Sequence, residues 1–184
     1  MIIFDRDEFI IARISDTVEI IEIEELHGEN RLTLKLPADI PESVHALPGN
    51  FVGLLDMDGN FQVYEINDAH TISQPERDIL LLQCDHLFYE LATEKIKTLT
   101  FTNVSAGFAI NQILLGTRWA AGTIDDLGLR TGTTFEENPL KALYTAAELW
   151  GGELRFRLAI DILHMILNIP GGHPLSVHSN DLFS

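Results

Sequence analysis

Apolar and polar residues alternate over much of the first half of the chain, and this two-residue period predicts β-strands. Residues 31–36 place three leucines on one face and charged or hydroxyl-bearing residues on the other, as in a strand with one wet face. Residues 17–26 form a second predicted strand, whose isoleucines fall in both phases of the alternation. We therefore predict a β-bulge near Ile20. Residues 2–14 predict a pair of short strands around a polar turn.

The clearest hairpin joins residues 50–56 to residues 61–67. Its connection, residues 57–60, contains an Asp-Gly pair, which favours the tight primed turns of two-stranded hairpins. The same bend has a second interpretation as a metal loop, because acidic and amide side chains occur at alternate positions within it.

A calcium loop would use Asp56, Asp58 and Asn60 as ligands. Two features argue against it. Gly59 occupies the fourth position of such a loop rather than the sixth, and Asn67 stands where a glutamate would close it. We therefore favour the hairpin turn.

The end of the first half predicts a buried strand and a short helix. Residues 78–84 are apolar enough to be buried on both faces, and Asp85 is the predicted cap of a helix at residues 86–92. Six or seven short strands separated by turn signals predict a small barrel or sandwich. Residues 93–98 are the predicted boundary between two domains.

Helical spacing dominates the second half. A strand at residues 99–103 leads to a helix that Asn103 or Ser105 caps and Gly116 ends. A second helix has the same design, with its cap at Asn138.

That second helix is the best-defined element of the sequence. Asn138 is a good N-cap, Pro139 suits the first helical position, and Gly151 supplies the left-handed residue that ends a helix. Further strands are predicted around the two helices and their polar connecting loop (125–132), and they comprise residues 119–124, 133–135, 152–158 and 160–169.

These elements predict an α+β protein. Residues 1–94 are expected to form a small β-barrel-like or sandwich-like domain. Residues 95–169 are expected to form a split β-α-β domain with two helices on an antiparallel sheet, and residues 170–184 a flexible C-terminal tail.

Composition narrows the classes of function. The chain has 184 residues and a net charge of −16, which opposes binding to nucleic-acid phosphates and to anionic membranes. No apolar run approaches the roughly 18 residues of a membrane-spanning helix, and the acidic N-terminus lacks the form of a secretory signal peptide. Cys84 is the single cysteine, so an intrachain disulfide is excluded and synthesis in a reducing compartment is expected.

Histidine and cysteine offer three candidate sites, and each has a simpler structural interpretation. A metal could be held by His164, His173 and His178, but zinc sites need ligands on rigid elements, and these residues lie in or near the predicted tail. His86 next to an aspartate could act as a general base; we favour His86 in the first turn of the capped helix. Cys84 on a buried strand is expected to be a core residue rather than a nucleophile.

Carboxylates and tryptophans offer two more candidate sites. The pairs Glu24-Glu25, Asp125-Asp126 and Glu136-Glu137 would suit glycoside hydrolysis, but paired carboxylates are expected by chance in so acidic a chain. Trp119 and Trp150 would suit stacking on sugars, yet their places after helix ends favour core packing. We therefore predict no catalytic, cofactor-binding or metal-binding residues and no cofactor.

Two spaced patterns resemble a known family. They are F-x-N-x-S-A-x-x-A-I-x-x-I-L-x-G-T-x-W at residues 101–119 and F-E-x-N-P-L-x-A-L-x-x-A-A-E-x-W-G-G-E-L-x-F at residues 135–156. Both resemble the N-terminal hub region of phage and prophage tail proteins, the tail-associated lysin or prophage tail endopeptidase family, which is similar to the baseplate hub of contractile-tailed phages. The likeness extends from about residue 1 to about residue 158, and the segment from residue 160 departs from it.

The resemblance implies a virion structural protein at the tail tip, made in the bacterial cytoplasm during assembly. It implies a homotrimer that meets a distal tail ring protein, closes the tail tube and carries modules for host cell entry. Any peptidase or lysin activity is then expected C-terminal to this chain, which is shorter than a complete hub. An acidic channel would repel DNA through like charge. Two alternatives stay open: a fragment of a cell-wall hydrolase and a module that binds surface polysaccharide.

Overall fold

The computed structural model of the chain describes residues 1–17, 19–24, 30–57, 59–93, 95–134 and 138–156. The predicted strand at residues 160–169 and the predicted tail at residues 170–184 lie outside this part of the chain. The elements are, in chain order, β1 (Ile2–Phe4), β2 (Ile10–Arg13), β3 (Glu19–Glu24), β4 (Asn30–Pro37), the 3₁₀ helix η1 (Pro41–His45), β5 (Phe51–Leu55), β6 (Phe61–Ile72), β7 (Ile79–His86), the 3₁₀ helix η2 (Leu87–Ala92), β8 (Leu99–Ser105), α1 (Ala106–Ile113), β9 (Leu129–Thr134) and α2 (Pro139–Trp150).

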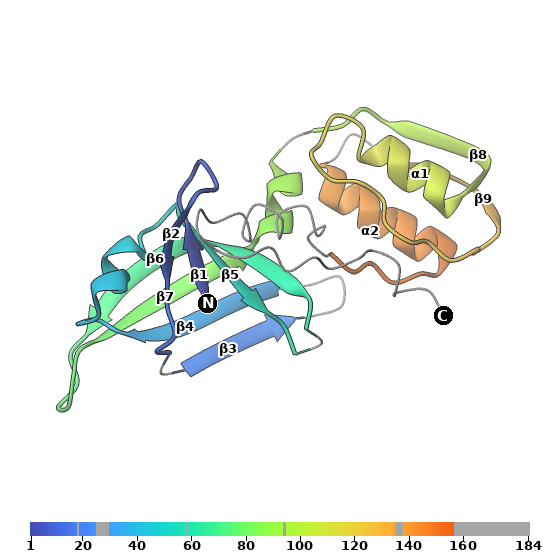
Figure 1. The fold of residues 1–184 in the computed structure, drawn as a ribbon. Coiled ribbons are helices and arrows are strands. Elements are labelled where there is room, and N and C mark those ends of the chain that lie inside the picture. Colours follow the sequence, from blue (N-terminus) through green and yellow to red (C-terminus); the bar gives the residue numbers. More distant parts are fainter. Residues whose placement is uncertain (18, 25–29, 58, 94, 135–137, 157–184) are drawn as a thin grey trace, which may run out of the picture.

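The first half forms one antiparallel sheet of seven strands in the order β2-β1-β5-β6-β7-β4-β3. The sheet curls, with β1 and β2 crossing in front of its other strands in Figure 1. Its two end strands, β2 and β3, are not paired with each other among the described residues. The sheet is therefore curled but open, where the sequence predicts a small barrel or sandwich. Closure of a barrel needs matched edges along the whole strand, and β2 has only four residues.

Leucines of β4 form the centre of the core of this sheet, as their alternation predicts. Leu32, Leu34 and Leu36 are all fully buried. On the neighbouring strand β7, Leu82 and Cys84 lie opposite Leu34 and Leu32. Removing such side chains from water is the main source of stability for a sheet of this kind, at about 25 cal/mol per Å² of apolar surface.

The predicted bulge near Ile20 is absent. Strand β3 pairs with β4 in continuous register from Glu19 to Glu24. The irregular positions lie elsewhere, between Ile66 and Asp68 of β6 and between Ile3 and Phe4 of β1. The two-phase isoleucine pattern of β3 has another cause, which is that apolar residues remain exposed on both faces of this end strand.

The predicted hairpin of β5 and β6 is confirmed. Its strands pair from Phe51↔Glu65 to Leu55↔Phe61. The carboxylate of Asp56 accepts hydrogen bonds from the backbone N–H of Asn60 (2.8 Å) and from its side chain. Asp56 therefore closes the hairpin through these hydrogen bonds. Asp58 lies outside the described residues, so the type of turn stays a prediction.

The second half has the predicted α+β character. Strands β8 and β9 form a two-stranded antiparallel sheet, and α1 and α2 pack against each other and against these strands (Figure 1). Ser105 is the N-cap of α1, because its hydroxyl accepts the N–H of Phe108 at 3.3 Å. The alternative cap, Asn103, instead adopts a left-handed conformation (φ 53°) before the helix begins.

Helix α2 follows the sequence prediction residue by residue. The side chain of Asn138 accepts the N–H of Lys141 at 2.8 Å, Pro139 begins the helix, and Gly151 ends it at φ 71°. Trp150 is buried, and its indole N–H donates to the carbonyl of Gly128 at 3.2 Å. Core packing is therefore the role of this tryptophan.

Two strand predictions in this half are wrong. Residues 119–124 and residues 152–156 have no strand partner among the described residues. Both segments instead place single apolar side chains, Trp119 and Phe156 among them, against the hydrophobic cluster of this half. Apolar residues that dock singly from an irregular loop give the same short-range pattern as a strand. Strand β9 begins at Leu129, inside the predicted loop.

The buried side chains form two hydrophobic clusters. One belongs to the seven-stranded sheet. The other gathers α1, α2 and β8, together with Phe88 and Leu91 of η2, which precede the predicted domain boundary. The division into domains at residue 94 stays a prediction. No helix within the described residues is long and apolar enough to cross a membrane.

Candidate functional site

The element η2 connects the sheet to the helical half, and His86, the last residue of β7, precedes it directly. Nδ1 of His86 accepts the N–H of Phe88 at 3.1 Å, so the histidine side chain is the N-cap. Asp85, the predicted cap, lies in β7 instead and forms an ion pair with Arg31 at 3.2 Å. Strand β7 continues two residues beyond the predicted end at residue 84, and the capping position moves from Asp85 to His86.

His86 is held in one neutral form. Nδ1 is occupied as an acceptor, and Nε2 lies 3.0 Å from Oε1 of Gln62, so the ring proton resides on Nε2. Gln62 in turn donates to the carboxylate of Asp56 at 2.9 Å. Burial lowers the pKa of His86 to about 4. A buried imidazole with both nitrogens engaged is a structural cap, and it is poorly placed to act as a general base.

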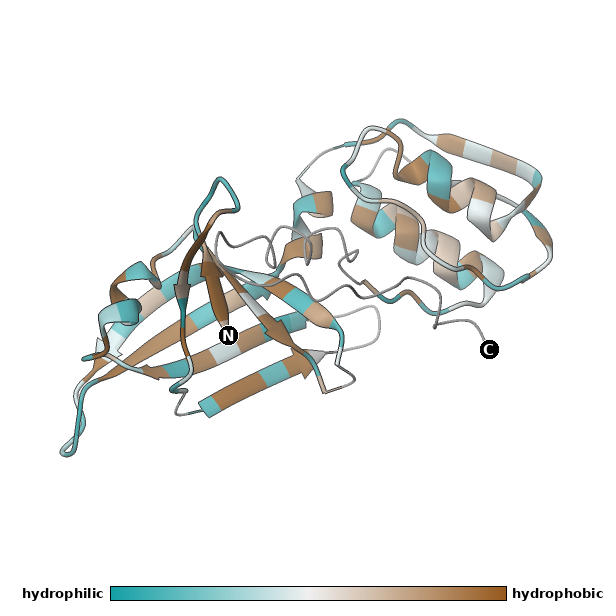
Figure 2. Cartoon of the chain, in the orientation of Figure 1, coloured by the Kyte–Doolittle hydropathy of each residue, from teal (hydrophilic) through white to brown (hydrophobic). Residues whose placement is uncertain are grey.

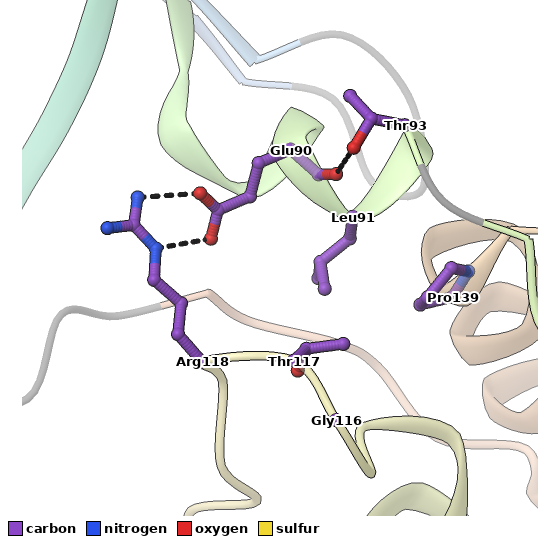
Figure 3. Close-up of a pocket in the computed structure, with 7 residues that line it drawn as sticks. All are labelled: Glu90, Leu91, Thr93, Gly116, Thr117, Arg118 and Pro139. Atoms are coloured by element: carbon purple, nitrogen blue, oxygen red, sulfur yellow. Dashed lines mark hydrogen bonds and ion pairs between the residues drawn. The ribbon is translucent and has the colours of Figure 1, made fainter.

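Arg118 forms the main polar contact between the two halves of the chain. Its Nε and one terminal nitrogen bind the two carboxylate oxygens of Glu90 at 2.7 and 2.6 Å, and Figure 3 shows this two-pronged contact. Its other terminal nitrogen donates to Glu8, which is 110 residues away in the sequence. The hydrogen bond to Glu90 is the main cause that raises the pKa of Arg118. The indole N–H of Trp119 also donates to Glu90.

Glu8 reaches Arg118 from a strained turn. It lies between β1 and β2 and adopts a left-handed conformation (φ 64°), which costs a residue with a Cβ roughly 1 kcal/mol. The carboxylate of Asp5 holds the turn by accepting the N–H groups of Asp7 (3.0 Å) and Phe9 (2.9 Å). Strain of this kind persists where surrounding contacts determine the backbone, and here the turn presents Glu8 to Arg118.

A pocket of about 210 Å³ lies beside this contact. Its lining residues, all drawn in Figure 3, are Glu90, Leu91, Thr93, Gly116, Thr117, Arg118 and Pro139. The two hydroxyls do not face a base: Thr93 donates to the Glu90 carbonyl at 2.7 Å, and Thr117 to the Leu114 carbonyl at 2.8 Å. The pocket therefore lies where packed elements meet, and its hydroxyl groups are engaged in local hydrogen bonds.

The remaining candidate residues are dispersed. Cys84 is buried, and burial raises the pKa of its thiol to about 12, which makes it a poor nucleophile. Asp125 and Asp126 are exposed, and Asp126 accepts the N–H of Gly128 in a turn at 3.0 Å. Trp119 is partly buried edge-on against Phe156, at 5.8 Å between ring centroids.

Several candidates lie outside the described residues. These are Glu25, Glu136, Glu137, His164, His173 and His178, and the side chain of Glu24 is likewise outside them. Among the described residues, no group of three or more histidine, cysteine or acidic side chains is placed to hold a metal.

Sequence reasoning missed Arg118 and Glu8. A single arginine after a helix-ending glycine carries no local signal of its partner. The two acidic residues that bind it lie 28 and 110 positions away. One indirect signal existed: Glu8 belongs to a polar turn without glycine, where a left-handed residue is strained.

Comparison with known proteins supports the resemblance of the second half. Residues 93–166 match the model of a family described as the prophage endopeptidase tail domain. This range begins at the end of η2 and includes both helices and β8 and β9. The sequence-based resemblance to phage and prophage tail proteins is therefore confirmed for this part of the chain.

Among solved structures, the chain is similar to the tail protein from Neisseria meningitidis MC58. The two share 13% sequence identity, with a TM-score of 0.43 over 68% of this chain. The similarity covers 41% of the Neisseria protein, so the chain spans less than half of that protein's length. No curated protein sequence matches the chain significantly.

Proposed function

We propose that this chain is a structural component of a phage or prophage tail tip, acting as part of a baseplate hub. The observation that carries the proposal is the match of residues 93–166 to the prophage endopeptidase tail domain. The site geometry supports it. The polar contacts around η2 join one packed half of the chain to the other, as a scaffold requires.

The proposal includes assembly. We propose that three copies form a ring that meets a distal tail ring protein, closes the tail tube and carries modules for host cell entry. The net charge of −16 supports a channel that repels DNA, provided that part of this charge faces the axis of the ring. A trimer whose acidic residues all lie on its outer rim would contradict the channel.

We assign no peptidase activity to the described residues, although part of the chain matches the prophage endopeptidase tail domain. His86 and Cys84 are buried, and the hydroxyls of the pocket donate to backbone carbonyls. Release of soluble fragments from purified peptidoglycan by the purified chain would contradict this assignment and support the hydrolase alternative.

Electron microscopy of intact tails tests the location directly. Gold-labelled antibodies against the purified chain should mark the tail tip at the end distal to the head. Labelling along the tube, or no labelling of tails that are shown by blotting to contain the chain, would reject the hub role. Light scattering across a range of protein concentrations tests the trimer separately. A monomer at every concentration would restrict trimer formation to the assembled tail.

A further inference from the structure

Strand β3 is an open edge. It pairs with β4 on one side, and no described strand pairs with its other side. The register with β4 is continuous, and the strand sequence EIIEIE contains neither proline nor lysine. Proteins usually protect a free edge with such residues, with bulges or with inward charges, because an unprotected edge is a template for another strand.

The inner face of β3 has one such protection. Ile20 and Glu22 lie opposite Leu34 and Leu32, so their side chains are on the side of the core. The carboxylate of Glu22 accepts the hydroxyl hydrogen of the buried Tyr64. An inward charge of this kind discourages a purely apolar strand from joining the edge, but a basic residue placed beside it would be compatible.

The outer face of β3 is apolar where the neighbouring strand is polar. Ile21 and Ile23 lie opposite Thr33 and Arg31. Their exposed fractions are 42% and 44%, and that of the inner Ile20 is 45%. Figure 2 shows β3 as a largely hydrophobic band at the border of the sheet. Apolar side chains half exposed on both faces indicate a strand that gains cover when another strand lies beside it.

Charge decides between a second copy of the chain and a different protein. Strand β3 contains three glutamates in six residues. Two basic residues of β4 lie opposite it, and both have acidic partners: Lys35 is paired with Glu19, and Arg31 is paired with Asp85. Antiparallel pairing of two β3 strands would bring glutamates next to glutamates or next to isoleucines. Like charges placed opposite one another destabilise a strand pair. The complementary strand is therefore basic.

We propose that the free edge of β3 binds an extended strand of a different protein, in which basic residues lie opposite the glutamates and β-branched apolar residues lie opposite the isoleucines. Backbone hydrogen bonds along the edge supply affinity, and the side-chain order supplies specificity. Opposite the strand EIIEIE, the order is basic, apolar, apolar, basic, apolar, basic.

The test uses the full chain and synthetic peptides. The probes are a six-residue peptide of lysine and valine in that order and the peptide of reversed order. The matched control has the same lysines but a proline at a central valine, which removes a backbone donor and leaves the charge unchanged. Binding is followed by NMR of the isotope-labelled chain at about 0.15 M salt, where the screening length is about 8 Å.

The expected result is that one probe shifts the amide signals of β3 and slows their hydrogen exchange, while the proline control does neither. The double variant I21T/I23T keeps β-branched side chains but loses apolar contact, and it should weaken probe binding on the order of tenfold. Its control is Ile72→Thr on the interior strand β6, which should bind as the parent does.

Three results would overturn the proposal. Equal responses to the probe and the proline control would show that bulk charge, and not strand addition, causes the binding. Self-association that rises with protein concentration and disappears in I21T/I23T would assign the edge to a second copy. Absence of any response at β3 would show that the edge does not bind a strand of this side-chain order, and this would also reject the proposal.

Discussion

The guanidinium of Arg118 binds the carboxylate of Glu8, which lies 110 residues earlier in the chain and on the opposite side of the predicted domain boundary. Glu90 binds the same guanidinium with both of its oxygens. One cation thus joins a turn of the sheet, the connecting element η2 and the loop after α1.

Removal of this cation should loosen the junction. Arg118→Met should lower the free energy of unfolding on the order of 1 kcal/mol, because its ion pairs are partly exposed and such pairs are individually weak. Urea unfolding measures the change. Arg155→Met is the control and should have a smaller effect, since the ion pair that Arg155 makes within the described residues is a local one with Glu153. Equal effects of the two substitutions would show that the junction is not held by Arg118.

The left-handed backbone of Glu8 gives an unusual order of stability among its variants. Glu8→Ala and Glu8→Gly both lose the contact with Arg118, but glycine adopts the left-handed conformation without strain. Glu8→Gly should therefore be more stable than Glu8→Ala by about 1 kcal/mol, measured by urea unfolding. Greater stability of the alanine variant would show that this turn relaxes in solution.

Stability should fall in mild acid because of His86. Its pKa is about 4 in the folded chain, against 6.5 for an ordinary histidine, so between these values the unfolded chain binds the additional proton. The contribution of neutral His86 to the free energy of unfolding is complete above about pH 6.5. It is lost as the pH falls toward 4, and the free energy of unfolding then decreases by about 3 kcal/mol at most.

The variant His86→Asn isolates this effect. Asparagine is a good N-cap and can accept the N–H of Phe88, but it does not titrate. Urea unfolding from pH 4.5 to pH 7.5 should show a shallower pH dependence for the variant than for the parent. Parallel curves for the two proteins would show that His86 does not control acid stability.

Cys84 should be inert toward thiol reagents in the folded chain. Burial excludes the reagent and raises the pKa of the thiol to about 12, so the reactive thiolate is scarce at neutral pH. A chromogenic disulfide reagent should react fully in concentrated urea and very slowly without it. Rapid reaction of the native chain would show that β7 opens locally.

Gly53 should not tolerate a side chain. A Cβ at this position would lie 2.4 Å from Phe61 and 2.8 Å from Phe4, whose rings form an edge-to-face pair. Gly53→Ala should cost about 1–3 kcal/mol of stability in urea unfolding. The control, Gly122→Ala, has no atom within 4 Å of the new Cβ and should change stability little. If Gly53→Ala left the free energy of unfolding unchanged, the rings of Phe4 and Phe61 would have to separate freely.

Local signals predicted those elements whose geometry is decided locally. The caps of α2, Asn138 and Gly151, act through backbone groups within a few residues of themselves, and the leucine alternation of β4 needs only one buried face. These predictions matched the structure because no distant contact competes with them.

Predictions failed where a distant partner decides the outcome. The isoleucines of β3 occur in both phases of the alternation, and this pattern predicts a bulge. An end strand whose two faces are both half exposed has apolar residues in both phases without a bulge. The role of Arg118 depends on Glu8 and Glu90, which reach it only after the chain folds back. Residues 119–124 dock singly and gave a false strand pattern.

The contact between Trp119 and Glu90 makes the junction optically visible. The indole of Trp119 lies beside a carboxylate and an arginine, whereas Trp150 is enclosed in apolar packing. Emission from the two tryptophans therefore arises in different surroundings. Trp150→Phe would leave Trp119 as the single tryptophan, at the point where the two halves of the chain meet. Separation of those halves in solution could then be followed without any attached dye.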